Sequence, residues 1–176
     1  MALPYVRPKQ AVLPSGVCFG ATVAAIIEQD GRFLLVEEHT PEGLRLNNPA
    51  GHLDPGESLE DGCAREALEE TAHIFYPRAI VGVYMSRFLR PARDKTRTQD
   101  VTYLRMAFCG TLGALQADRA LDKGIVRTLW LTADEVRASA ARHRSPLVVR
   151  CMEDYLAGQR YPLAMIHTDA TVTLQK

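Results

Sequence analysis

The segment from Ser58 to Thr71 limits most strongly what this chain can fold into, because it predicts an amphipathic helix between runs of strand-forming residues. It contains no proline, and its content of Ala, Leu, Glu and Arg favours helix. Pro55-Gly56 marks a turn just before it, and Ser58 followed three residues later by Asp61 is typical of an N-cap. We therefore expect a helix with a capped N-terminus.

Strand-forming segments lie on both sides of this predicted helix. Val17 to Glu28 is rich in Val, Ile, Ala and Thr, which indicates a largely buried strand. Asp30-Gly31 is a hairpin turn signal, and Arg32 to Glu38 is the strand that would follow it. A polar loop is expected from there to Asn47. Beyond the helix, the predicted strands are Ala79 to Leu89, Val101 to Leu112 and Arg127 to Leu131.

Helix signals follow the last predicted strand. Thr132 and Glu135 make a capping box for a helix running toward Arg142. Ser145-Pro146 opens a final helix that Gly158 can close. Strands, a helix, more strands and then helices predict a mixed α/β (α+β) domain in which helices cover a sheet.

A single domain is expected from a length of 176 residues, since a chain of this size can bury a substantial core. Residues 17–166 are assigned to it, with a flexible N-terminal leader at 1–16 and a C-terminal tail at 167–176. No apolar run approaches the roughly 18 residues of a membrane span. Residues 1–16 contain three prolines and no apolar stretch typical of a signal peptide. These features predict a cytoplasmic protein that does not enter a membrane.

The charge balance argues against a large polyanionic partner. Lys plus Arg (21) equal Asp plus Glu (21), so no net field attracts nucleic acid or an anionic membrane. An anionic substrate must then be held by a local site.

The cysteines form no CxxC pair and are expected to be reduced, mostly buried thiols; they are Cys18, Cys63, Cys109 and Cys151. A monomer is expected, with a homodimer as the alternative.

Carboxylates gather on one face of the predicted helix. With Glu66 placed at zero on a helical wheel, Glu70 falls at about 40° and Glu69 at about −60°. Arg65 lies on the shoulder of this face, and Glu57 can reach back toward it from the preceding turn. The opposite side, expected to pack on the sheet, carries Ala64, Ala67, Leu68 and Thr71.

Such an acidic face destabilises a helix unless a cation binds to it. Like charges four residues apart each cost a few tenths of a kcal/mol. Mg²⁺ prefers hard oxygen ligands and commonly shares its coordination positions between carboxylates and substrate phosphates. A bound Mg²⁺ also polarises a phosphorus–oxygen bond and lowers the pKa of a bound water. A solvated acidic face is the alternative.

The spacing of the segment decides between these alternatives. Gly51, five residues, Glu57, seven residues, Arg65-Glu66, two residues and Glu69-Glu70 specify six positions. A chance match has odds on the order of one in 10⁵ at ordinary residue frequencies. The pattern resembles the Nudix box of the Nudix hydrolases.

The resemblance implies a fold, a metal site and a reaction. The fold would be a Nudix-like α/β/α sandwich with a mixed β-sheet. The resemblance also implies Mg²⁺, with Mn²⁺ as an alternative, and attack of an activated water on phosphorus. Glu69, Glu70 and Arg65 would be the catalytic residues, Arg65 orienting the glutamates. The implied metal ligands are Glu66, Glu69, Glu70, Glu57 and the carbonyl of Gly51.

One departure from the box concerns the end of the helix. Gly usually stands where this chain has Ala72. Gly accepts a positive φ at a helix end, which Ala resists by roughly 1 kcal/mol. We therefore expect the helix terminus, rather than the set of ligands, to be unusual.

The resemblance covers roughly residues 18–166 and extends to segments outside the box. Those segments are Gly31 to Glu38, Asn48 to Leu53, Arg144 to Leu147 and Gly158 to Leu163. They resemble bacterial Nudix hydrolases that release phosphate from nucleoside di- and triphosphates and from the thiamine-precursor pyrimidine diphosphate. A small-molecule nucleotide or pyrimidine diphosphate is therefore the expected substrate. An ADP-ribose or dinucleotide pyrophosphatase, and a non-catalytic nucleotide-binding module, are the alternatives.

Cationic residues outside the box are candidates for substrate binding. Arg90, Arg93 and Arg97 lie on a polar loop that could approach substrate phosphates, and a mobile solvated loop is the alternative. Arg160 and Tyr161 follow the final helix. A guanidinium and an aromatic ring suit phosphate and ring-stacking contacts, but packing of the C-terminal segment is the alternative.

Overall fold

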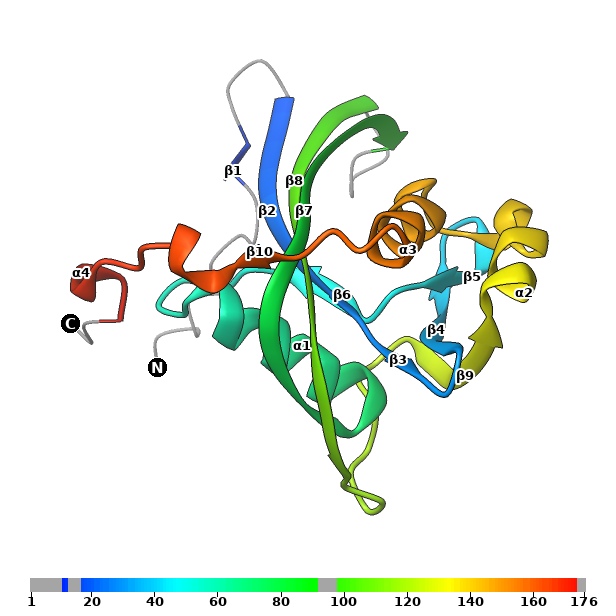
Figure 1. Cartoon of the computed structure of the whole chain (residues 1–176). Helices are drawn as coiled ribbons and strands as arrows, with labels where there is room; N and C mark the ends of the chain where they lie inside the picture. Colours follow the sequence, from blue (N-terminus) through cyan, green and yellow to red (C-terminus); the bar gives the residue numbers. More distant parts are fainter. Residues whose placement is uncertain (1–10, 13–16, 92–97, 174–176) are drawn as a thin grey trace.

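The computed structural model describes residues 11–12, 17–91 and 98–173. Within these ranges the strands form two sheets, and helices pack on both faces of the larger one (Figure 1). This arrangement confirms the predicted mixed α+β fold.

The larger sheet is mixed. In the described residues its order is β1-β2-β8-β7-β10, and β6 pairs with β2. β2 and β8 are parallel, whereas the other pairs are antiparallel. Its strands are β1 (Ala11–Val12), β2 (Val17–Ile26), β6 (Ala50–His52), β7 (His73–Pro91), β8 (Thr98–Leu115) and β10 (Tyr161–Pro162).

The smaller sheet contains, in the described ranges, β3 (Glu28–Gln29), β4 (Arg32–Thr40), β5 (Gly43–Asn47) and β9 (Ile125–Thr132). The Asp30-Gly31 hairpin is confirmed: both residues have positive φ, 52° and 75°, as a tight hairpin turn requires. One prediction was wrong here. The segment expected as a polar loop forms β5, a strand of 5 residues whose apolar side chains are only Leu44 and Leu46, so its strand signal is weak.

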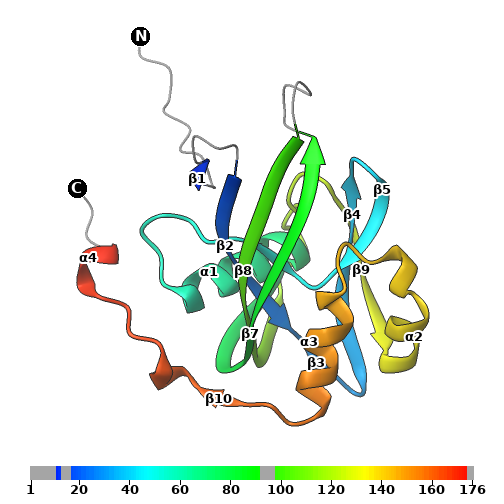
Figure 2. The same ribbon diagram turned by 90° about the horizontal axis from the view of Figure 1, so that it is seen from above.

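A second correction concerns the strand expected from Val17 to Glu28. The chain leaves the larger sheet after Ile26 and continues as β3 in the smaller sheet, so one predicted strand is two. Ile27 keeps the hairpin register, because its carbonyl accepts a hydrogen bond from the Leu34 amide at 2.9 Å. Figure 2 shows β4, β5, β9 and α2 (Ala133–Ala138) grouped on one side of the long strands.

Alternating residues of β2 divide the core between the two faces of the larger sheet. Ala24 and Ile26 pack with residues of α3 (Leu147–Leu156), such as Met152. Val23 and Ala25 pack with residues of α1 (Leu59–Thr71), such as Ala67. Side chains alternate between faces along a strand, so α1 and α3 cover opposite sides of the sheet.

The two ends of α1 follow the expectations from the sequence. Ser58 is the N-cap, and its side chain accepts a hydrogen bond from the Asp61 amide at 3.0 Å. Ala72 ends the helix in the left-handed region with φ 59° and ψ 9°, and its amide donates to the Leu68 carbonyl. An alanine therefore occupies the conformation that glycine adopts at lower cost.

The C-terminal helices agree in position with the predictions, and one differs in length. The capping box of Thr132 and Glu135 is present, but α2 ends at Ala138 and a separate 3-10 turn, η1 (Ala140–Arg142), follows. α3 begins after Pro146, and Gly158 lies just beyond its end with φ 81°. The chain then forms η2 (Leu163–Met165) and α4 (Ala170–Thr173).

The predicted leader lies mostly outside the described residues. The exception is β1, which pairs with β2 through Ala11 opposite Phe19 and Val12 opposite Cys18. Among the helices of the described residues, none has the length and hydropathy needed to cross a bilayer.

Candidate active site

The acidic face of α1 is packed against protein and does not face bulk solvent. Glu66 is 6% exposed and Glu70 is 9% exposed, beside the apolar contacts of Cys63 and Ala67. The stripe predicted to pack on the sheet was partly wrong. Ala67 and Thr71 are buried, whereas Ala64 and Leu68 are only half-buried. The helix is rotated so that its glutamates turn toward β6.

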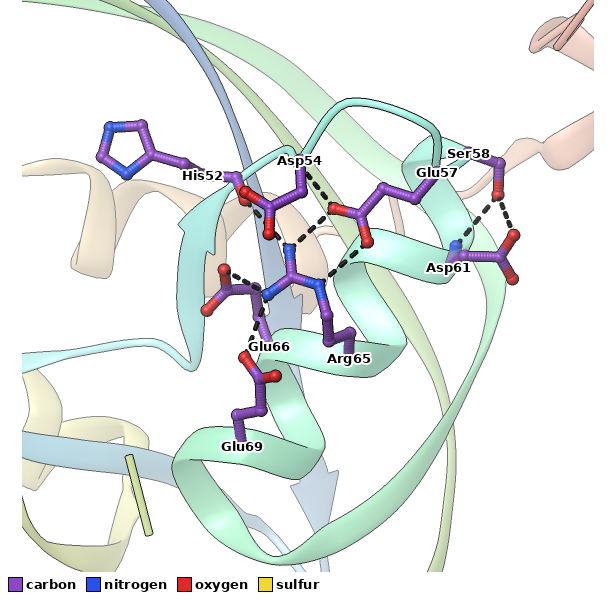
Figure 3. Close-up of polar contacts among 8 residues, drawn as sticks. All are labelled: His52, Asp54, Glu57, Ser58, Asp61, Arg65, Glu66 and Glu69. Carbon is purple, nitrogen blue, oxygen red and sulfur yellow. Dashed lines mark hydrogen bonds and ion pairs between the residues drawn. The ribbon is translucent and has the colours of Figure 1, made fainter. Parts of the chain in front are cut away.

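Arg65 holds the carboxylates together through all five of its N–H donors (Figure 3). Its Nε and Nη2 form a fork with Glu57, at 2.8 and 2.7 Å. Nη1 donates to Glu66 at 2.8 Å and to Glu69 at 3.0 Å. Nη2 also donates to the His52 carbonyl at 3.0 Å. Because the guanidinium is planar, these bonds fix the relative positions of the three carboxylates.

Glu57 is positioned by the turn that precedes α1. Its Oε1 accepts a hydrogen bond from the Asp54 amide at 2.7 Å, in addition to the fork from Arg65. A Cβ atom at Gly62 would lie 2.8 Å from this oxygen. The glycine in the first turn of α1 therefore leaves room for the Glu57 carboxylate to reach back over the helix.

Gly51 gives Glu66 its space in the same way. Gly51 is in β6, opposite Val23, and a Cβ atom there would lie 2.2 Å from both oxygens of the Glu66 carboxylate. Real Cβ atoms do not approach other atoms so closely. The backbone of β6 and the Glu66 carboxylate are thus in direct contact, which accounts for the glycine that begins the box.

Glu70 lies next to the same strand. Its Oε2 accepts a hydrogen bond from the Ala50 amide at 2.9 Å. Burial raises the pKa of Glu70 to about 8; the hydrogen bond from Ala50 opposes this rise, and the charges of Glu66 and Glu38 add to it. A nearby cation would favour the charged form of such a carboxylate.

The residues fit a hard divalent cation by their chemistry. One guanidinium is set against several carboxylates, and the buried Glu66 and Glu70 repel each other. Oxygen atoms are the ligands that Mg²⁺ prefers. Among the residues that the structure describes, no three His, Cys, Asp or Glu side chains are already gathered as a metal centre. Arg65 instead bridges Glu57, Glu66 and Glu69.

Three charged residues that we did not predict lie near Glu70. Glu38 of β4 forms an ion pair with Arg144 and accepts a hydrogen bond from Asn47 at 3.2 Å. Arg105 of β8 is influenced by the charges of Glu38, Glu70 and Arg144. Arg105 carried a signal in the sequence: its strand parity matches that of the core residues Ala107 and Cys109, so it is a charged residue on a core-facing side.

Among the other predicted substrate-binding residues, the structure describes the side chains of Arg160 and Tyr161. Arg93 and Arg97 lie outside the described residues, and so does the side chain of Arg90. Arg160 packs over the Tyr155 ring, 3.7 Å from its centroid, and Tyr161 pairs with Ile80.

The strand order shows how far apart these groups are. β10, which contains Tyr161, and β6, which contains Gly51, are separated by β2, β8 and β7. The geometry therefore does not support a role for Arg160 or Tyr161 at the carboxylate cluster.

Comparisons with known proteins agree with this geometry. A model of the NUDIX domain matches residues 19–151. The phosphatase NudJ of Escherichia coli strain K12 is 37% identical over 145 residues, which cover 82% of this chain and 88% of that protein. A NUDIX hydrolase from Nitrosomonas europaea is similar in structure, with a TM-score of 0.72 and 48% identity, covering 85% of this chain and 97% of that one.

A more distant similarity concerns the fold alone. An ADP-ribose pyrophosphatase from Streptococcus suis superposes with a TM-score of 0.53 at 17% identity, over 81% of this chain and 95% of that one.

Proposed function

The chain belongs to the Nudix hydrolase family, and we propose that it cleaves a phosphoanhydride in a nucleoside di- or triphosphate or in a pyrimidine diphosphate, releasing phosphate. Nudix hydrolases act on small nucleotides and generally use a divalent metal ion. The similarity to a protein described as a phosphatase favours release of phosphate. One observation carries the proposal: Arg65 gathers Glu57, Glu66 and Glu69 against the backbone of β6.

We assign a metal-binding role to the acidic face of α1. Glu66, Glu69 and Glu70 would hold Mg²⁺, with Mn²⁺ as a substitute, and Glu57 and the Gly51 carbonyl would contribute. When bound, the cation would neutralise phosphate charge and lower the pKa of a bound water. The family resemblance supports this assignment, as does the burial of Glu66 and Glu70.

Residues of this chain would position the carboxylates and accept the proton of the attacking water. Arg65 is a positioning residue, because its hydrogen bonds keep the carboxylates in place during the reaction. Glu69 or Glu70 would accept the proton of the attacking water. Glu69 has the more accessible carboxylate, with 31% of its side chain exposed. Glu70 is buried and hydrogen-bonded to Ala50.

A substrate screen with one variant and one control tests the proposal. Phosphate release would be measured from nucleoside di- and triphosphates, ADP-ribose and the thiamine-precursor pyrimidine diphosphate, with Mg²⁺ or with a chelator. Glu70→Gln keeps the size of the side chain and removes its charge, so we expect at least a hundredfold loss of kcat. Glu42→Gln changes an exposed carboxylate outside the site and should leave turnover unchanged. Turnover of Glu70→Gln within a few-fold of the wild type would contradict the metal assignment.

Product analysis separates the proposal from its alternatives. Inorganic phosphate from a nucleoside diphosphate supports a phosphatase, whereas two monophosphates from ADP-ribose or a dinucleotide indicate internal cleavage. Tight nucleotide binding with no product in Mg²⁺ or Mn²⁺ would identify a binding module instead.

A further inference from the structure

Arg105 differs from the arginines around it in the hydrogen bonding of its guanidinium. Its Nη1 is buried without a hydrogen-bond partner among the described residues, and no ion pair joins it to a carboxylate there. Arg65 and Arg144, in contrast, each contact carboxylates. A buried cation without a partner is costly, because it loses water and gains nothing in return.

The register of the larger sheet places Arg105 on the face that α3 covers, close to the edge strand that Glu70 contacts. Ala50 of β6, whose amide donates to Glu70, is opposite Ala24 of β2, and Ala24 is beside Ala107 of β8. Arg105 is two residues before Ala107, so it projects from the same face of the sheet as Ala24 and Ala50. Since neighbouring strands are about 4.8 Å apart, β6 and β8 are about 10 Å apart, a gap that an extended arginine and a phosphoryl group can span.

Several charged residues act on the guanidinium of Arg105. Burial lowers the pKa of its guanidinium, and the charge of Arg144 adds to this effect, whereas the charges of Glu38 and Glu70 oppose it. Glu38 is already paired with Arg144, and Glu70 accepts from Ala50. The residue as a whole is only half-buried, so a ligand can approach it.

We infer that Arg105 binds a phosphoryl group of the substrate, opposite the carboxylates that would hold the metal. This inference rests on the proposed function and deepens it. A planar guanidinium donates hydrogen bonds to two phosphate oxygens at once, which matches a di- or triphosphate better than a neutral ligand. The free energy lost by burying Arg105 in the free protein would be recovered when an anion pairs with it.

The test uses the sign of a stability change. In Arg105→Met the unpaired charge is replaced by an apolar side chain, so the free protein should become more stable, with Tm higher by about 2–4 °C. A structural arginine would give the opposite result. The matched control is Arg87→Met, the same substitution at an exposed residue of β7 paired with Asp100; it should not raise Tm or change ligand binding.

Ligand binding is measured on the same variants with the non-hydrolysable α,β-methylene-ADP in the presence of Mg²⁺. We expect Arg105→Met to bind it at least tenfold more weakly, and to raise KM more than it lowers kcat. Arg105→Gln, which is neutral but polar, should also lose at least tenfold. The rise in Tm caused by inorganic phosphate and the rise caused by AMP are measured separately for the wild type and Arg105→Met. The ligand whose stabilising effect is lost in the variant shows whether Arg105 binds the released or the retained phosphate.

Each outcome supports or overturns the inference. A lower Tm, wild-type affinity in Arg105→Met or Arg105→Gln, or failure of both variants to fold would overturn it, because removal of an unpaired charge should not unfold the protein. The proposed function fails separately, if the wild type binds these ligands through Arg105 but releases no product from any substrate.

Discussion

Gly51 and Glu66 are packed so closely that a Cβ atom at position 51 would lie 2.2 Å from the Glu66 carboxylate. The contact joins the edge strand β6 to the middle of α1. It also brings the Gly51 backbone, through Glu66, next to the guanidinium of Arg65. Two of the positions that define the sequence motif are therefore in contact in the fold.

Gly51→Ala should separate activity from stability. The Glu66 side chain is flexible and can move, so the free energy of unfolding should fall by only about 1 kcal/mol, the low end for overpacking. The displaced carboxylate should weaken Mg²⁺ binding by about ten- to a hundredfold, measured by calorimetric titration. Adding Glu66→Asp shortens the side chain and should restore stability without restoring metal affinity. Wild-type Mg²⁺ affinity in Gly51→Ala would show that the contact is not needed.

Arg65→Lys tests the paired hydrogen bonds that the planar guanidinium donates to Glu57. Lysine keeps the charge but cannot make the paired hydrogen bonds to Glu57 while also contacting Glu66 and Glu69. We expect a loss of about 1–3 kcal/mol in the free energy of unfolding and at least a tenfold loss of kcat/KM. Arg137→Lys, at an exposed ion pair with Glu153, is the control and should change both quantities far less. Equal effects of the two substitutions would contradict the role given to Arg65.

Ala72→Gly tests the strained end of α1. Relief of the left-handed conformation should gain about 1–2 kcal/mol, while loss of a buried methyl and a more flexible unfolded chain cost a similar amount. We therefore expect a free energy of unfolding within about 1 kcal/mol of the wild type. Ala67→Gly removes a methyl from the buried interior of the same helix and should be clearly more destabilising. If denaturant unfolding gives equal losses, Ala72 is not strained.

The ion pairs of the buried Glu37 predict that the protein loses stability in acid. Its side chain is 4% exposed and forms ion pairs with Arg127 and Arg142. The hydrogen bond from Arg127 lowers the pKa of Glu37 below its ordinary value of 4.5, against the effect of burial. Because the folded pKa is the lower one, the stabilisation is present above pH 4.5 and is lost as the pH falls through the folded pKa.

The measurement is Tm against pH for the wild type and Glu37→Gln. The variant should be less stable at neutral pH, and the two curves should converge below pH 4.5. Glu153→Gln, at an exposed pair with Arg137, should show a smaller difference. Curves that stay parallel as the pH falls well below 4.5 would show that Glu37 does not titrate as described.

Local signals in the sequence predicted the elements around the site. The N-cap at Ser58, the Asp30-Gly31 turn and the capping box of Thr132 depend on residues a few positions apart, so they could be recognised without the fold. The approach of Glu57 and Arg65 was expected for the same reason, because a turn and a helix bring them together.

Contacts between distant segments could not be predicted in this way. Arg105 meets its neighbours only through the pairing of β8 with β2 and β7. Glu38 meets Arg144 across more than a hundred positions. The orientation of α1 also depends on packing: Ala64 and Leu68 were expected to face the sheet, but contact with β6 turns Glu66 and Glu70 inward.

The parallel pairing of β2 with β8 has a consequence for the order of folding. Thr22 donates a hydrogen bond to the Leu104 carbonyl across 82 positions of the chain. All of α1 lies between these two segments, and closing so long a loop is slow and entropically costly. During synthesis the helix can form early, but its glutamates acquire their final surroundings only after β8 has joined the sheet. A nascent chain ending before Thr98 therefore has the whole motif and no site.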